Sequence, residues 1–188
     1  MRKIGILGGT FDPPHKGHLR IAKAAIKNLH LDEVIFIPCN KHNLKGNSAI
    51  ASKFHRSNMV ALLCASEEKF NLENYELEKG GISYTIETLK FLKKKYRKFH
   101  FFLLLGKDSY DNFHLWKSPE KIRKIATLVV FPRDNKKIVL KNPKDIEVKM
   151  RRIDISSSEI RKNFSSDLGI QKFIPNAVLD YIKKHKLY

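Results

Sequence analysis

A glycine-rich segment near the start of the chain carries residue types that suit phosphate binding. It runs GGTFDPPHKGH from Gly8 to His18, between an expected strand and an expected helix. Glycines let the backbone approach a ligand closely, and N–H groups at a helix start favour an anion. His15 and His18 can both face that anion. The segment predicts a phosphate site. The alternatives are two ordinary polar residues at a helix start, or a zinc site that lacks further close ligands.

A second segment, ISSSEIR from Ile155 to Arg161, combines a helix start with further polar groups. Ser156 and Glu159 have the spacing of a capping box, and flanking isoleucines fit the accompanying hydrophobic staple. A plain helix start leaves the additional hydroxyls and Arg161 unexplained. Those groups suit the oxygens of a triphosphate, so the cap and the binding site are compatible interpretations.

Two further candidates follow the most apolar run of the chain, Phe99–Leu105. Asp108 stands just after Gly106, where an acid at a strand end commonly binds ribose hydroxyls; helix capping by Asp108 or Ser109 is the alternative. Trp116 is the only tryptophan. It stands in the polar stretch HLWKSP, which allows a ligand contact as well as an ordinary place in the core.

The elements that must position these residues alternate along the chain. Short apolar runs predict buried strands, and apolar residues at helical spacing predict the helices between them. This alternation is typical of crossover units with a parallel sheet, and runs such as FFLLL suit strands covered on both faces. In open sheets of this class, ligands bind beyond the carboxyl ends of the strands. The expected strands are residues 3–7, 34–37, 99–105 and 127–131, with a short one near 146.

The remaining expectations complete an α/β domain over residues 1–188, with helices on both faces of the sheet and a small helical part at about 155–188. We expect residues 39–51 to form a loop and residues 70–77 to be extended. A turn is expected at 79–81. The expected helices lie near 17–29, 52–65, 86–96, 107–113, 118–125 and 177–185.

Composition narrows the class of protein. The formal net charge is +18, which favours anionic partners, although the lysines are spread along the whole chain and also suit an ordinary solvated surface. Cys39 and Cys64 stand in apolar contexts and are expected to be buried, reduced thiols. The chain has no run of about 18 apolar residues, and its first residues do not have the pattern expected of a signal peptide. We therefore expect a cytoplasmic protein without membrane contact.

Several motifs together resemble one family. GGTFDPPHKGHL is similar to the signature of the nucleotidyltransferase α/β-phosphodiesterase superfamily, and within it the chain most resembles bacterial nicotinate mononucleotide adenylyltransferases. The resemblance covers nearly the whole chain. The other motifs are SYTIETL at 83–89, LLGKDSYDNFHLW at 104–116, ISSSEIR at 155–161 and the ending IPNAVLDYIKKHKLY.

The resemblance implies a Rossmann-like fold and transfer of an adenylyl group from ATP to nicotinate mononucleotide. It implies direct in-line attack without a covalent intermediate, so catalysis depends on positioning and charge stabilisation. His15, His18 and Arg161 are then the catalytic candidates, with His18 favoured for the transition state. The implied ATP-binding residues are Gly8, Gly9, Thr10, Phe11, His15, His18, Gly106, Asp108, Ser157, Ser158 and Arg161.

The same resemblance assigns the mononucleotide to Tyr84, Thr85 and Trp116, with Lys45 from the preceding loop. Mg²⁺ is expected with ATP, bound through phosphate oxygens and water, so no protein metal ligand is nominated. A homo-oligomer is compatible with the sequence, which does not determine the oligomeric state.

Two departures from the family pattern affect these expectations. The family usually carries Pro-Pro-His-Lys after the second strand, whereas this chain has Asn40-Lys41-His42-Asn43-Leu44-Lys45. The loop of this chain is basic, like the family's loop. The family pattern nevertheless does not assign phosphate contacts to individual residues of this loop. Lys79 stands where the family often has arginine, which loses a bidentate fork.

Three other functions remain open from the sequence. A preference for nicotinamide mononucleotide is the nearest alternative. Backbone donors and local charge discriminate between the two acceptors, and the sequence separates these poorly. Phosphopantetheine adenylyltransferases share the first motif but typically have threonine where this chain has His15, and they lack SYTxxTL. A basic nucleic-acid-binding module would account for the charge, yet no such motif is present and the phosphate loop would be unexplained.

Overall fold

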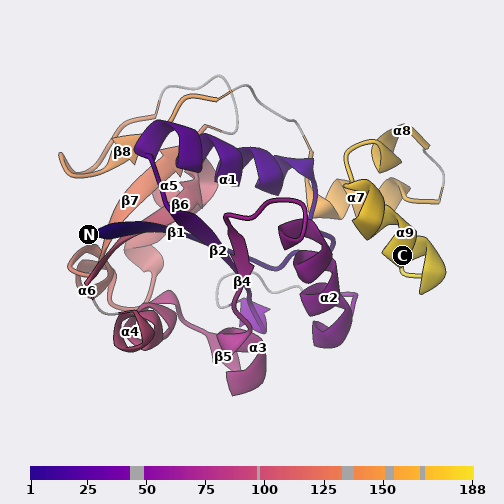
Figure 1. Ribbon diagram of the computed structural model, residues 1–188, viewed down its shortest axis with the longest axis horizontal. Helices are drawn as coiled ribbons and strands as arrows, with labels where there is room; N and C mark the ends of the chain where they lie inside the picture. Colours follow the sequence, from indigo (N-terminus) through magenta and orange to yellow (C-terminus); the bar gives the residue numbers. More distant parts are fainter. Residues whose placement is uncertain (43–48, 97, 133–137, 151–154, 166–167) are drawn as a thin grey trace.

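The computed structural model describes residues 1–42, 49–96, 98–132, 138–150, 155–165 and 168–188. A parallel six-stranded sheet in the order β4-β2-β1-β6-β7-β8 forms the centre of this part (Figure 1). The predicted α/β class and parallel sheet are confirmed. The strands are β1 (Arg2–Gly9), β2 (Glu33–Pro38), β4 (Phe70–Leu72), β6 (Phe99–Gly106), β7 (Ala126–Phe131) and β8 (Ile146–Glu147).

The central strands are buried on both faces because their apolar residues alternate between two cores. Successive side chains of a strand point to opposite faces. In β2, Val34 and Phe36 join the first core, while Ile35 and Ile37 join the second. β6 and β7 divide in the same way. This double burial explains why these strands are continuous apolar runs in the sequence.

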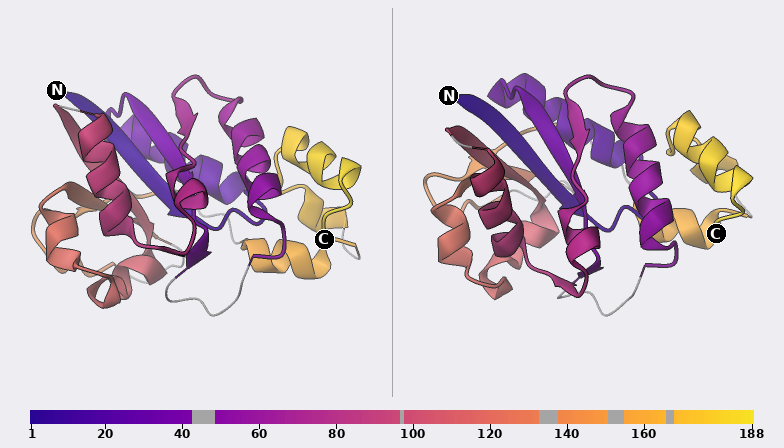
Figure 2. Two further views of the ribbon diagram at one scale, coloured as in Figure 1. Left: turned by 90° about the horizontal axis from the view of Figure 1, so that it is seen from below. Right: turned by 60° about the horizontal axis from the view of Figure 1, so that its bottom comes forward.

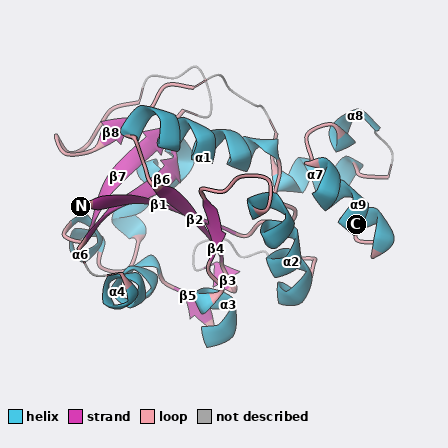
Figure 3. Ribbon diagram, in the orientation of Figure 1, coloured by secondary structure: helices cyan, strands magenta, loops and turns pink. Residues whose placement is uncertain are grey.

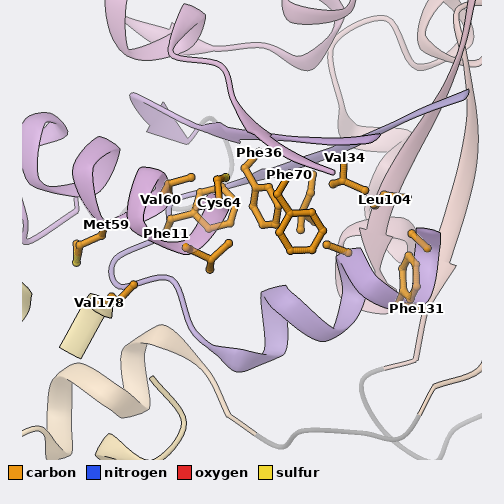
Figure 4. Close-up of a cluster of buried hydrophobic side chains, with 14 of the residues drawn as sticks. Phe11, Val34, Phe36, Met59, Val60, Cys64, Phe70, Leu104, Phe131 and Val178 are labelled. Atoms are coloured by element: carbon orange, nitrogen blue, oxygen red, sulfur yellow. The ribbon is translucent and has the colours of Figure 1, made fainter. Parts of the chain in front are cut away.

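Different helices cover the two faces. Helices α1 (Lys16–Leu29) and α2 (Lys53–Cys64) supply side chains to the first core, shown in Figure 4. Helices α4 (Thr85–Lys95) and α6 (Pro119–Arg123) supply the second. Figure 3 shows α1 above the sheet and α4 and α6 below it. The predicted helices on both faces are therefore confirmed.

The last described part of the chain is helical. It contains α7 (Ser157–Asn163), α8 (Leu168–Gln171) and α9 (Asn176–Lys184). The three helices lie together at one end of the molecule, beside α2 (Figure 2). Val178 and Ile182 of α9 are fully buried in the first core. This core contact attaches the C-terminal helices to the sheet domain.

The structure differs from the sequence expectations in several local elements. Residues 70–77 are extended only in β4, because residues 75–79 form helix α3 (Tyr75–Lys79), with the Gly80 N–H donating to the Glu76 carbonyl. The 39–51 segment was expected to be loop but contains β3 (Lys41–His42), which pairs with β5 (Ile82–Ser83). The sequence also did not predict α8. The short helical region after β6 divides into α5 (Lys107–Asp111) and the 3₁₀ helix η1 (Phe113–Leu115).

The two cysteines behave as the sequence predicts. Cys39 and Cys64, both in the described part, are buried and form no disulfide. Burial raises the pKa of the Cys64 thiol to about 12, so this thiol stays protonated and unreactive at neutral pH. Separately, the described residues include no helix whose length and apolar character would let it span a membrane.

Candidate active site

A cavity of about 710 Å³ lies at the carboxyl ends of the parallel strands, within the usual size range of small-molecule sites. The last residues of β1, β6 and β7 contribute to its wall. Most of the predicted site residues meet there, although they come from four separate stretches of the chain. Those lining the cavity are Gly8, Gly9, Thr10, Phe11, His15, His18, Tyr84, Thr85, Gly106, Trp116, Ser157, Ser158 and Arg161.

The two histidines form a reciprocal cap at the start of α1. His15 Nδ1 accepts from the Gly17 N–H at 3.1 Å, and His18 Nδ1 accepts from the His15 N–H at 3.1 Å. The ring centroids lie 3.9 Å apart. Because each Nδ1 is an acceptor, the proton of the neutral ring belongs on Nε2. The cap therefore fixes both rings as Nε2–H donors in the wall of the cavity.

Gly17 is required by this arrangement. A Cβ atom at this position would lie 2.8 Å from two atoms of the His15 ring, which is closer than side chains pack. Any larger residue must displace the imidazole. Gly17 thus leaves the space that the His15 ring occupies. This role is additional to the close backbone approach that the sequence suggests for the glycines of the first motif.

The loop after β1 is held in a costly backbone conformation. Phe11 has a φ of +51°, a region that non-glycine residues rarely adopt. Its side chain is fully buried, with its ring 5.9 Å from Phe36 and 4.9 Å from His18. Core packing of this ring therefore fixes the backbone of Thr10 and Phe11 along the cavity.

Helix α7 is docked against the same loop. The capping box predicted for Ser156 and Glu159 is present. Ser157 Oγ donates to the Pro13 carbonyl at 2.9 Å, and Arg161 Nη1 donates to the Asp12 carbonyl at 2.6 Å. Two motifs more than 140 residues apart in the chain are joined in this way.

Asp12 is a buried acid at the centre of this docking, and the sequence interpretation missed it. It is 1% exposed. Its carboxylate accepts the N–H groups of Ile50 and Ala51 at 2.7 and 3.1 Å and the hydroxyl of Tyr188. Arg161 Nη1 lies 3.6 Å from the same carboxylate. Burial, and next the Asp12 hydrogen bond, raise the pKa of Tyr188, so its hydroxyl remains a donor.

Arg56 on α2 is a second missed residue. Its side chain is 2% exposed, and Nη1 donates to the carbonyls of Thr10 at 2.8 Å and Cys39 at 2.7 Å. It thus ties the loop after β1 to the end of β2. The sequence did contain a signal, because the buried residues of this helix have the spacing of one face: Arg56, Met59, Val60, Leu63 and Cys64. An arginine on such an apolar stripe indicates a buried charge with a specific partner.

The other end of the cavity is aromatic. Tyr84 precedes α4 and Thr85 begins it, while Trp116 follows η1 and is half-buried beside Phe113. Lys117 also lines this end. Flat aromatic faces and a helix start make this a suitable place for a planar ring with an anionic substituent.

Comparison with known proteins agrees with this geometry. A model of the cytidylyltransferase-like family matches residues 6–163. A probable nicotinate-nucleotide adenylyltransferase from Clostridium beijerinckii is 38% identical, with all of both chains covered. One from Borreliella afzelii is 39% identical, covering 99% of this chain and 96% of its own.

The chain belongs to the nicotinate-nucleotide adenylyltransferase family.

Solved structures of the family share the fold. A Plasmodium falciparum nicotinic acid mononucleotide adenylyltransferase complexed with APC has a TM-score of 0.83 and 26% identity, covering 100% of this chain and 98% of its own. The complex of the enzyme from the same organism with NaAD has a TM-score of 0.81 and 28% identity over the same shares. The Rossmann-like nucleotidyltransferase fold expected from the family motifs is thereby confirmed.

One predicted site residue lies outside the cavity wall, and another lies outside the described residues. Asp108 is exposed in the first turn of α5, next to Ser109, which does line the cavity. It does not cap the helix, whose N-cap is Gly106. Its contact with ribose stays a prediction. Lys45 lies outside the described residues, so its contact with the mononucleotide also stays a prediction.

A buried acid completes the aromatic end. Glu76 of α3 is 9% exposed, lines the cavity and accepts a hydrogen bond of 2.5 Å from the Thr88 hydroxyl. Burial raises the pKa of this carboxyl.

Elsewhere, the described residues contain no group of three His, Cys, Asp or Glu side chains that could share a metal ion.

Proposed function

We propose that this chain transfers the adenylyl group of ATP to nicotinate mononucleotide, giving nicotinate adenine dinucleotide and pyrophosphate in NAD biosynthesis. One observation carries the proposal: a single cavity joins the capped histidine pair of α1 to the aromatic end at Tyr84 and Trp116. The relatives named for this activity, and the related enzyme complexed with NaAD, support it.

The reaction needs positioning more than covalent chemistry. A phosphate oxygen of the mononucleotide attacks the α-phosphorus of ATP, and the bond from that phosphorus to the pyrophosphate breaks in line with the attack. His15 and His18 would donate from Nε2 to the oxygens of ATP, with His18 meeting the charge that develops at the α-phosphoryl group. The backbone of Thr10 and Phe11 would line the phosphate path.

Arg161 and the hydroxyls of α7 would hold the rest of the triphosphate. Arg161 lines the cavity, and its Nη2 donates to the Ser158 hydroxyl at 3.3 Å, so its guanidinium stands where a phosphate could accept from it. Ser157 and Ser158 stand beside it in the cavity wall. Magnesium would arrive as Mg·ATP, coordinated by phosphate oxygens and water, and would neutralise charge on the leaving pyrophosphate.

The pyridine ring of the acceptor would lie at the aromatic end. Trp116 would stack on the ring, and backbone N–H groups at Thr85 would meet its carboxylate.

Release of pyrophosphate from Mg·ATP that requires nicotinate mononucleotide tests the overall proposal. Acceptor-independent release, or no release, would contradict it.

Replacing Trp116 by alanine tests the place of the ring. We expect the KM for nicotinate mononucleotide to rise about tenfold, because stacking on an aromatic face contributes roughly 1–2 kcal/mol. The KM for ATP should change less than twofold. Initial rates over a grid of both substrates measure the two constants.

The matched control is Phe54→Ala, which removes an aromatic ring that is 65% exposed and outside the cavity wall. Both KM values should stay as in the wild type. An unchanged mononucleotide KM in Trp116→Ala would remove this side chain from the acceptor site.

A further inference from the structure

Lys117 brings a positive charge to the aromatic end of the cavity, and no motif draws attention to it. Its ammonium lies 4.0 Å from the centroid of the Tyr84 ring and 2.9 Å from Glu87 Oε1. The residue lines the cavity. The side chain is 49% exposed, so solvent screens its ion pair. It is therefore a half-solvated charge that already lies on a ring of the proposed acceptor site.

Glu87 does not neutralise this charge, because it has a second partner. Lys79 Nζ lies 2.5 Å from Glu87 Oε2. The two lysines hydrogen-bond to separate oxygens of one carboxylate and lower its pKa, which leaves one positive charge in excess. Of the two lysines, only Lys117 lines the large cavity. If Lys117 turns toward a ligand, Lys79 can still neutralise Glu87.

At this end of the cavity the start of α4 also favours an anionic ligand, whereas the acid Glu76 opposes one. Helix α4 begins at Thr85, and Tyr84 provides no side-chain cap, so the positive end of an eleven-residue helix faces the same region. Glu76 is the acid that the cavity wall holds nearby, and Thr88 donates to it. The Lys117 ammonium is therefore the side-chain group best suited to meet an added negative charge at this end.

We propose that Lys117 is a specificity-determining residue, whose ammonium favours an acceptor with a carboxylate on its pyridine ring over one with a carboxamide. The inference rests on the proposed function and deepens it. A ring placed between Tyr84 and Trp116 brings its substituent near the ammonium that now lies on Tyr84. A carboxylate gains a charge-assisted hydrogen bond from Lys117. A carboxamide carries no charge and gains much less.

Lys117→Gln removes the charge and keeps a polar side chain. We expect kcat/KM for nicotinate mononucleotide to fall about tenfold, since half-exposure weakens a charge-assisted contact. For nicotinamide mononucleotide, kcat/KM should stay within twofold. The KM for ATP should not change. The variant should likewise weaken binding of nicotinate adenine dinucleotide relative to NAD, measured by calorimetry.

Lys90→Gln is the matched control, because it removes an equal charge from an exposed lysine of α4 that lies outside the cavity wall. It should leave the acid-to-amide ratio unchanged, and Lys117→Arg should retain most of it. Equal losses for both acceptors in Lys117→Gln, or an unchanged ratio, would overturn the inference alone. A wild-type protein that uses neither acceptor would overturn the proposed function as well.

Discussion

His18→Ala should lower kcat for adenylyl transfer by about 100- to 1,000-fold, the usual loss when one donor to a transition state is removed. The Nδ1 atom of His18 accepts the His15 N–H at 3.1 Å. The proton of the neutral His18 ring is therefore on Nε2. We expect that proton to stabilise the charge developing at the α-phosphoryl group. Single-turnover rates at saturating Mg·ATP and mononucleotide measure the effect on the chemical step.

The cap and the chemistry can be separated by a second variant. His18→Asn keeps an oxygen that can accept the His15 N–H but lacks a donor at the Nε2 position. It should fold as stably as the wild type and be about as slow as His18→Ala. His100→Ala, in an exposed histidine near the start of β6, should retain full activity. Turnover of His18→Asn within threefold of the wild type would remove His18 from the transition state.

Arg56→Met should lower the free energy of unfolding by about 2–4 kcal/mol. The substitution keeps an unbranched side chain but leaves the carbonyls of Thr10 and Cys39 without the donor that they share in the folded protein. A hydrogen bond to a charged group contributes roughly 1.5–3 kcal/mol. Urea denaturation followed by circular dichroism measures the change, and the KM for ATP should rise because the loop after β1 loses an anchor.

Lys53→Met provides the comparison, because Lys53 is an exposed cation on the same helix, α2. It should change stability by less than about 0.5 kcal/mol. A loss below about 1 kcal/mol in Arg56→Met would mean that water or a rearranged loop satisfies the two carbonyls. Arg56 would then not be the residue that joins the ends of β1 and β2.

The sheet could be predicted because its signal is local and repeated. Strands buried on both faces are continuous apolar runs, as in β6, and the helices between them show their own period. The elements that were missed are too short to carry a period. β3 and β5 have two residues each, and they pair only because the chain brings Lys41 beside Ile82. Tertiary contacts decide such elements.

The site was predictable only where one motif contains the necessary residues. The histidine cap of α1 and the capping box of α7 are both contained within a few residues of sequence. The docking of the two motifs depends on Asp12, which contacts Arg161 and Tyr188 across 149 and 176 residues. No spacing in the sequence indicates those partners. Arg56 could be predicted in part. Its position on the apolar face of α2 indicates that it is buried, but does not identify the groups that it binds.

The most direct test of the account is pyrophosphate release from Mg·ATP with three acceptors in parallel: nicotinate mononucleotide, nicotinamide mononucleotide and phosphopantetheine. We predict release with a clear preference for nicotinate mononucleotide, and formation of nicotinate adenine dinucleotide in equal amount. Preference for either of the other acceptors would contradict the assignment of Tyr84, Thr85 and Trp116 while keeping the ATP half of the site. Release with none of the three would contradict the proposed function itself.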